Sequence, residues 1–149
     1  MTVSPLVREV HVSTDRATAF TLFTDHIGQW WPLGTHSVYG EQASVAFEDG
    51  ALVERAGAET SVWGEVLSWD PPSGFRITWH PGTDPAQATE VDVRFTEVGD
   101  QVRVTLTHTG WERRDDDARA GYDEGWVFVL GQFVEASEKA TAQSRFMNG

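Results

Sequence analysis

The amino-acid sequence predicts an α+β protein in which a curved antiparallel sheet of about seven strands wraps around one long C-terminal helix. Three observations support this fold class. Residues 44–109 mostly alternate apolar and polar side chains, which is the pattern of half-buried antiparallel strands. Residues 15–31 and 119–141 instead repeat their apolar side chains at helical spacing. One long helix cannot cover so large a sheet everywhere, so we expect a cavity between the two.

The first part of the chain is expected to form one strand and two short helices. Ser13 and Thr14 are residue types that favour a helix N-cap, and Asp15 suits a first helical turn. The apolar residues that follow recur at helical spacing until Pro32. We therefore expect a strand over 6–12, a helix over about 15–24, a short helix over 26–31 and an irregular segment over 33–42.

Six further strands are predicted, separated by residue combinations that favour turns. These combinations are Glu48-Asp49-Gly50, Asp70-Pro71-Pro72 and Gly99-Asp100. We expect the strands around 45–47 and over 51–55, 61–69, 75–79, 90–96 and 102–109. Their parity predicts an inward face made of Phe75, Ile77, Trp79, Val91, Val93, Phe95, Val102, Val104 and Leu106. Trp63 and Trp69 share one parity, but a bulge near Gly64 would reverse it, so their facing is left open.

The last element is a long helix over about 119–141. Its apolar face combines Tyr122, Trp126, Val129, Leu130, Phe133 and Val134, whereas Phe128 lies on the opposite face. No linker or internal repeat interrupts the sequence. We therefore expect one domain over residues 1–149, with its core at about 6–141.

Charge and composition exclude several classes of function. The sequence has 149 residues, with 23 Asp and Glu against 11 Lys and Arg, and its net charge is −12. Nucleic acids and anionic membranes are bound mainly through Lys and Arg, so we expect neither as a partner. The absence of cysteine excludes a disulfide scaffold, a thiolate zinc site and a cysteine nucleophile. The sequence has no apolar run of the ~20 residues that a membrane helix needs and no signal-peptide pattern, so we expect a cytoplasmic protein.

Sequence motifs for metal or nucleotide chemistry are also missing. The five histidines, His11, His26, His36, His80 and His108, lack the close spacing that zinc motifs use. The sequence has no P-loop, no dinucleotide fingerprint and no nucleophile elbow. We therefore expect no metal and no cofactor.

Four stretches carry a resemblance to a known superfamily. They are Ala17–Phe23 with Thr24-Asp25 and Trp30-Trp31; Gly64–Leu67 with Asp70-Pro71-Pro72 and Phe75–Trp79; Val104–Trp111; and Gly125-Trp126 with Leu130 and Phe133. Their order and spacing, over about residues 6–138, are similar to the START-like, or SRPBCC, superfamily, which includes the birch-pollen-allergen type. Within it the chain resembles the branch of the heat-shock-protein ATPase activator (Aha-type, C-terminal domain). The resemblance implies a helix-grip fold.

What the resemblance implies about function is less specific. Members of the superfamily are known as lipid and hormone binders, polyketide cyclases and co-chaperone modules, and a shared fold does not choose among these. Our first hypothesis is that the chain binds a small apolar or aromatic molecule in a cavity between sheet and helix. One alternative is a cyclase- or hydrolase-type enzyme that uses the same cavity. The other is a protein-interaction module that binds a chaperone. We disfavour it because such a module would hold the chaperone with a separate N-terminal domain, whereas we expect a single domain here. A homodimer is compatible with each hypothesis.

The tryptophan content indicates where a ligand would bind. The sequence has seven Trp, more than a core of this size needs, and large rings often line ligand cavities. The residues that we expect in the ligand pocket are Trp30, Trp31, His36, Trp79, His108, Trp126, Leu130 and Phe133. His36 would belong to a lid over the cavity mouth, and His108 would be a polar anchor.

His108 and Glu54 are the candidate catalytic residues, and each has a structural alternative. His108 has inward parity at the end of an apolar strand, where it would orient a ligand, act as an acid or base, or form a structural hydrogen bond near Trp111. Glu54 faces inward if Leu52 does, but we favour a solvated charge on an edge strand. The sequence does not bring the two side chains together, so binding without catalysis is the favoured interpretation.

Overall fold

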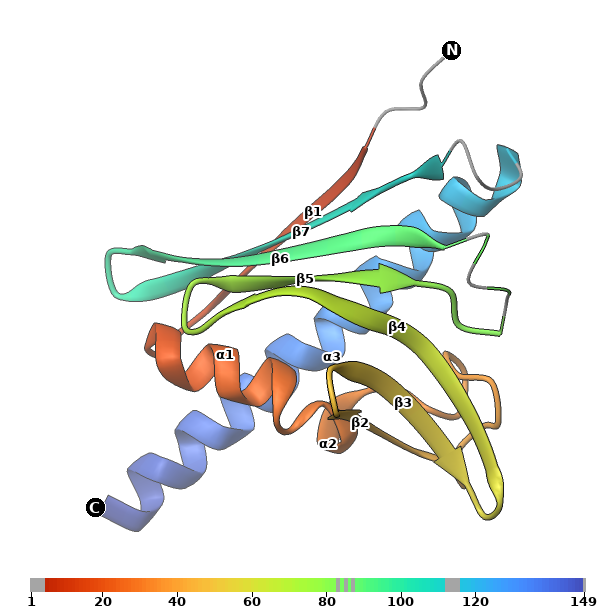
Figure 1. Ribbon diagram of the computed structural model, residues 1–149. Coiled ribbons are helices and arrows are strands. Elements are labelled where there is room, and N and C mark those ends of the chain that lie inside the picture. The colour runs from red at the N-terminus through yellow and green to blue at the C-terminus, as the bar shows by residue number, and fades with distance from the viewer. Residues whose placement is uncertain (1–4, 83, 85, 87, 112–115, 149) are drawn as a thin grey trace.

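The computed structural model describes residues 5–82, 84, 86, 88–111 and 116–148, and it has the predicted α+β fold (Figure 1). The elements in chain order are β1 (Leu6–Val12), α1 (Arg16–Thr24), α2 (Ile27–Trp30), β2 (Ser44–Glu48), β3 (Ala51–Ala56), β4 (Glu59–Asp70), β5 (Gly74–Trp79), β6 (Thr89–Val98), β7 (Gln101–Thr109) and α3 (Asp116–Asn148). The long helix begins before and ends after its predicted bounds of 119–141, whereas most strands agree with the prediction to within two residues.

All seven strands join in one antiparallel sheet with the order β1-β7-β6-β5-β4-β3-β2. Strands that follow one another in the chain are neighbours from β2 to β7. The exception is β1, which pairs with β7, so that Leu6 lies opposite His108. The segment with α1 and α2 carries the chain from that edge of the sheet to the other. Figure 1 shows the sheet curving around α3, which crosses it obliquely, with α1 beside the helix.

The core lies between the inner face of the sheet and the helices. All nine strand residues that parity placed on the inward face are buried, as are Trp126, Leu130 and Phe133 of α3 and Phe20 and Phe23 of α1. Aromatic rings form a large part of this core: the ring centroids of Phe23 and Phe133 lie 5.0 Å apart, and those of Phe23 and Phe95 lie 5.8 Å apart. Edge-to-face arrangements at these distances stabilise a core beyond the burial of area.

Two bulges in β4 decide the facing of its tryptophans. Leu52 pairs with Gly64 while Val53 pairs with Val62, so Trp63 is an extra residue. A second register shift follows between Val66 and Ser68. Each shift reverses the parity of the strand, and both Trp63 and Trp69 therefore face the inner side. Trp63 is fully buried, whereas Trp69 is 41% exposed at the rim, where its ring lies 5.5 Å from that of Phe75.

The first bulge depends on a glycine. A Cβ atom at Gly64 would lie 1.7 Å from the carbonyl oxygen of Thr78 on β5. No other residue fits there, because any side chain would separate the two strands. Gly64 therefore allows the close approach that turns Trp63 inward.

Helix α1 begins at a capping aspartate. The side chain of Asp15 accepts hydrogen bonds from the backbone N–H of Thr18 at 2.7 Å and from its hydroxyl at 2.8 Å. The bond from the Thr18 backbone is the main cause that lowers the pKa of Asp15 below its ordinary value of 3.8. The cap is thus Asp15 itself, which directly follows the Ser13 and Thr14 that the sequence favoured.

Among the helices of the described residues, none combines the length and the apolar composition that a membrane-spanning segment requires.

Candidate ligand-binding pocket

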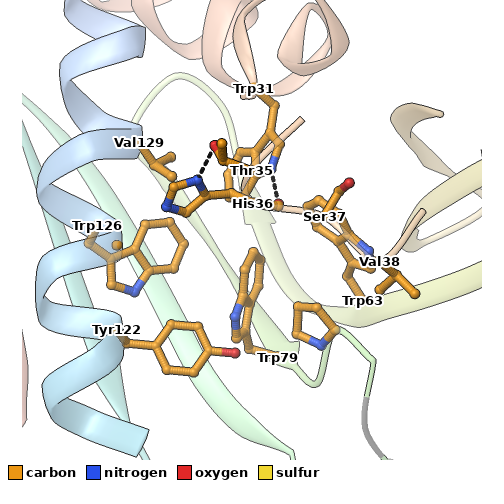
Figure 2. Close-up of a pocket in the computed structure, with 12 residues that line it drawn as sticks. Trp31, Thr35, His36, Ser37, Val38, Trp63, Trp79, Tyr122, Trp126 and Val129 are labelled. Atoms are coloured by element: carbon orange, nitrogen blue, oxygen red, sulfur yellow. Dashed lines mark hydrogen bonds between the residues drawn. The ribbon is translucent and has the colours of Figure 1, made fainter. Parts of the chain in front are cut away.

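A pocket of about 220 Å³ opens between the N-terminal half of α3 and the irregular segment that follows α2 (Figure 2). Its lining residues are Trp31, Thr35, His36, Ser37, Val38, Trp63, Trp79, Pro81, Tyr122, Gly125, Trp126 and Val129. The volume exceeds the ~150 Å³ of an apolar cavity that holds benzene. It is below the ~300–1,000 Å³ of pockets for drug-sized ligands. The pocket therefore has room for a molecule of one or two rings.

The walls of the pocket are mainly indole rings. The ring centroids of Trp31, Trp79 and Trp126 lie 5.2 to 6.0 Å from one another. Trp63 packs against two of them, at 5.1 Å from Trp31 and 5.8 Å from Trp79. Figure 2 shows the rings of Trp126 and Tyr122, which project from the helix, beside the ring of Trp79. Flat aromatic walls of this kind suit a planar, largely apolar ligand.

Three of the four indole N–H groups are held by the protein. Trp31 donates to the carbonyl oxygen of His36 at 2.7 Å, and Trp63 donates to Oε1 of Glu54 at 2.9 Å. Trp126 donates to Nδ1 of His108 at 3.0 Å. Nε1 of Trp79 differs: less than 1 Å² of this atom is exposed, and it has no hydrogen-bond partner among the residues that the structure describes. Buried donors without a partner are rare in folded proteins.

Glu54 is fully buried and holds the mouth of the pocket in place. Its two carboxylate oxygens accept the backbone N–H groups of Val38 and Tyr39, both at 2.8 Å, in addition to the indole N–H of Trp63. The favoured interpretation of a solvated edge charge is wrong, because β2 pairs with β3, which is therefore not an edge strand, and the side chain of Glu54 is fully buried. Glu54 is not among the residues that line the pocket. Its carboxylate has a structural use that the sequence did not show.

His108 is fully buried behind the helical wall of the pocket. Trp126 can only donate, so Nδ1 of His108 accepts, and the ring carries its proton on Nε2. Nε2 lies 2.6 Å from Oγ1 of Thr89, whose hydroxyl donates in turn to the carbonyl oxygen of Trp79 at 3.2 Å. This series of bonds connects two walls of the pocket. The inward position predicted for His108 is confirmed, and the hydrogen bonds that the structure describes do not join it to Glu54.

His36 lies at the mouth of the pocket, in the segment that the sequence predicted as a lid. Its ring stacks on Phe128 of α3, with centroids 5.0 Å apart and planes 12° from parallel. Nδ1 lies 2.7 Å from the hydroxyl of Thr35. A Cβ atom on Gly125 would lie 3.9 Å from Nε2 of His36, so the ring sits directly over this glycine. The stacking explains why Phe128 occupies the otherwise polar face of the helix.

The predicted pocket residues divide into two groups. Trp31, His36, Trp79 and Trp126 line the pocket. Trp30, His108, Leu130 and Phe133 are buried in the core or behind the wall instead, and they are absent from the lining. Trp30 packs on Phe133 with ring centroids 5.2 Å apart and donates its N–H to the carbonyl oxygen of Leu22. Their contact with a ligand stays a prediction.

Several lining residues were not singled out from the sequence. Tyr122 and Val129 share the apolar helix face with Trp126, so that pattern could have identified them. Trp63 was left open because one bulge decides its facing. Thr35, Ser37 and Val38 lie in a segment without a period, where sequence alone gives no signal.

The lining contains polar atoms but no formal charge from Lys, Arg, Asp or Glu. The hydroxyl groups of Thr35, Ser37 and Tyr122 and the imidazole of His36 are its side-chain polar groups, and the N–H of Trp79 lies covered within the wall. Across the described residues, no group of three or more His, Asp or Glu side chains is arranged to hold a metal ion. The arrangement can therefore enclose a neutral ring and form a small number of directed hydrogen bonds with it.

Comparisons with known proteins give one family and one fold. The family model described as "Activator of Hsp90 ATPase homolog 1-like protein" matches residues 13–138. One similar solved structure is that of an anthrahydroquino-gamma-pyrone synthase, Txn09, complexed with SUM. Its sequence is 30% identical to this chain, and the match covers 82% of this chain and 86% of that chain with a TM-score of 0.57. A comparison with curated proteins gave no match.

Two further solved structures share the fold at lower identity. An AHSA1-like protein from Rhizobium etli is 22% identical, with a TM-score of 0.61 over 90% of this chain and 81% of that chain. The Aha1 dimer from Colwellia psychrerythraea is 16% identical, with a TM-score of 0.62 over 91% of this chain and 97% of that chain.

Proposed function

This chain belongs to the Activator of Hsp90 ATPase homolog 1-like family, within the SRPBCC superfamily, and on that basis we propose that it binds a small planar molecule in the pocket beneath His36. The observation that carries the proposal is the lining itself: four indole rings and one phenol ring surround about 220 Å³ without a charged side chain. Burial of an apolar ring there is favourable by roughly 25 cal/mol per Å² of apolar surface, before ordering costs.

The walls are already in place without a ligand, which lowers the ordering cost. Hydrogen bonds fix the indoles of Trp31, Trp63 and Trp126, and Glu54 fixes the backbone at the mouth. A preorganised site loses less conformational entropy on binding than one that must assemble around its ligand. These features support binding as a function rather than core packing alone.

A pair of glycine variants on α3 tests the proposal. Gly125 borders the pocket below His36, whereas a Cβ atom on Gly131 of the same helix would meet nothing within 4 Å. Leucine at position 125 fills the pocket, so Gly125→Leu should weaken the binding of naphthalene or tetralin, measured by NMR titration, by at least about tenfold. Gly131→Leu makes the same change of residue in open space and should leave the Kd unchanged. Equal binding by both variants, or no binding to the unmodified protein, contradicts the proposal.

Catalysis in the same pocket is a second candidate, which the synthase at 30% identity favours. The polar side chains available there are His36 and Tyr122, both of which line the pocket. An acid–base role predicts that His36→Ala or Tyr122→Phe lowers turnover by a factor of about 10² or more. The measurement is mass spectrometry of a bound ring compound before and after incubation. Unchanged ligand in every case leaves binding as the function.

Assembly and partners stay predictions from the family. The Colwellia psychrerythraea relative is an Aha1 dimer, which makes a homodimer of this chain worth testing by sedimentation. Binding to a chaperone ATPase remains the disfavoured alternative.

A further inference from the structure

We propose that Trp79 is the specificity-determining residue of the pocket: its indole N–H donates to a neutral oxygen, such as a carbonyl, on the bound ring. The inference rests on the proposed function and names the chemical class of the ligand. It predicts that the pocket prefers a ring ketone to the hydrocarbon of the same shape, and also to the corresponding carboxylate.

The first support is the contrast among the indoles of the molecule. Hydrogen bonds to protein atoms hold the N–H groups of Trp30, Trp31, Trp63, Trp111 and Trp126. Within the described residues, the buried Nε1 of Trp79 has no such partner, although Trp79 is only 3% exposed. Water does not reach the atom either, since less than 1 Å² of it is exposed. A ligand oxygen would supply the missing acceptor and remove the penalty of an unpaired donor.

The second support is the position of this nitrogen. Trp79 belongs to the pocket wall, and Figure 2 shows its nitrogen on the edge of the ring that faces the helical wall with Tyr122 and Trp126. The ring itself is held by packing, with Trp63 at 5.8 Å and Trp126 at 5.2 Å on its two sides. Because this nitrogen is covered, a ligand oxygen reaches it only if a neighbouring ring moves aside, and Tyr122 is the partly buried ring on that side. A donor on a fixed ring distinguishes ligands by where they carry their oxygen.

The third support is the charge of the surroundings. The lining has no Lys or Arg to compensate an anion, and the whole chain carries a net charge of −12. A carboxylate would lose its hydration there without a partner of opposite charge, which is unfavourable. A neutral carbonyl needs only one donor, and Trp79 provides it. The ligand class that fits is therefore a neutral planar ring with an oxygen acceptor.

A matched pair of ligands tests the role of Trp79 directly. The probes are 1-tetralone and tetralin, which differ in one carbonyl oxygen, with tetralin-1-carboxylate as the anionic comparison. In the unmodified protein we expect 1-tetralone to bind about five- to tenfold more tightly than tetralin, because it alone satisfies the buried donor. The carboxylate should bind more weakly than the ketone.

Two variants separate the N–H from the ring. Trp79→Phe removes the free donor, and the ratio of the two Kd values should fall to about one. Trp31→Phe removes a ring from the same wall, but its N–H is already bonded to His36, so the ratio should persist while both affinities fall. A ratio that survives in Trp79→Phe overturns the inference. So does a ratio of one in the unmodified protein, in which case ring binding, the proposed function, still stands; if neither probe binds, both fail.

An NMR measurement on the unmodified protein decides the matter even if a variant does not fold. The indole ¹H–¹⁵N signal of Trp79 should move downfield when 1-tetralone is added and should not do so with tetralin. A downfield shift of a different indole signal, with that of Trp79 unchanged, overturns the inference.

Discussion

The indole N–H of Trp63 and the carboxylate of Glu54 form a buried hydrogen bond of 2.9 Å across β3 and β4. The same carboxylate accepts two backbone N–H groups of the segment at the pocket mouth, Val38 and Tyr39. One side chain thus fixes both a wall and the entrance. The structure of the pocket therefore depends on a residue that the ligand would not contact.

Replacing that carboxylate should destabilise the protein without changing its shape. In Glu54→Gln, one oxygen becomes an NH₂ group that faces a donor, so at least one buried N–H loses its acceptor. We expect the free energy of unfolding to fall by about 1–3 kcal/mol, measured by urea denaturation. Glu59→Gln makes the same change of charge at an exposed site on β4 and should have an effect within about 0.5 kcal/mol. Equal stability of both variants would show that Glu54 is not a structural acceptor.

Removing the imidazole of His108 should weaken the protein through its neighbours. His108→Phe keeps an aromatic ring but leaves the N–H of Trp126 without its acceptor, whereas the hydroxyl of Thr89 keeps its bond to the carbonyl oxygen of Trp79. The expected loss of unfolding free energy is about 1–3 kcal/mol, which is the cost of one buried donor left unsatisfied. Near-ultraviolet circular dichroism should also change as Trp126 loses its fixed orientation. His26→Phe, at an exposed position, is the control, and equal effects of the two substitutions would contradict the prediction.

A methyl group should have opposite effects at two glycines. Gly64→Ala places its Cβ atom 1.7 Å from the carbonyl oxygen of Thr78, and separation of β4 from β5 should cost at least about 3 kcal/mol. Gly121→Ala lies on an exposed part of α3 where a Cβ atom meets nothing within 4 Å. Alanine is the better helix former, so this variant should gain about 0.8–1 kcal/mol. Thermal denaturation measures both, and a tolerated Gly64→Ala would exclude the bulge as described.

The cap of α1 should make part of the stability dependent on pH. The folded protein lowers the pKa of Asp15 below 3.8, so the charged cap stabilises the fold at neutral pH, and this contribution is lost as the pH falls through the folded pKa. Asp15→Ala should lose about 1 kcal/mol at pH 7 and less at pH 2–3. Asp15→Asn retains a capping oxygen that does not titrate, so it should stay close to the unmodified protein at pH 7. Urea denaturation at the two pH values measures the difference, and an equal loss from Asp15→Ala at both would contradict the prediction.

The fold was predictable because its signals are local. Alternation along 75–79, 90–96 and 102–109 predicts which residues face inward. In each of these segments the apolar residues predicted to face inward are buried in the folded sheet. The pairing of β1 with β7 has no such local signal, since Leu6 and His108 lie far apart in sequence. The resemblance of the whole pattern to a known fold supplied it.

The pocket lining was predictable only in part, because the backbone conformation at single residues determines which side chains reach the pocket. Trp30 and Trp31 are neighbours, yet Trp30 ends α2 and packs into the core, whereas Trp31 has extended backbone and lines the pocket. Glu54 is buried because backbone N–H groups 15 and 16 residues away meet it. Neither outcome follows from composition or periodicity. Both depend on where an irregular segment places its backbone.

The close packing of Trp31, Trp79 and Trp126 also makes the pocket wall an intrinsic optical probe. Rings whose centroids lie 5.2 to 6.0 Å apart have coupled electronic transitions, and this coupling depends steeply on their separation and mutual angle. A ligand that tilts one ring by a few degrees therefore changes the circular dichroism of all three. Wall movements can therefore be followed in the unlabelled protein, in the near-ultraviolet region where aromatic side chains absorb.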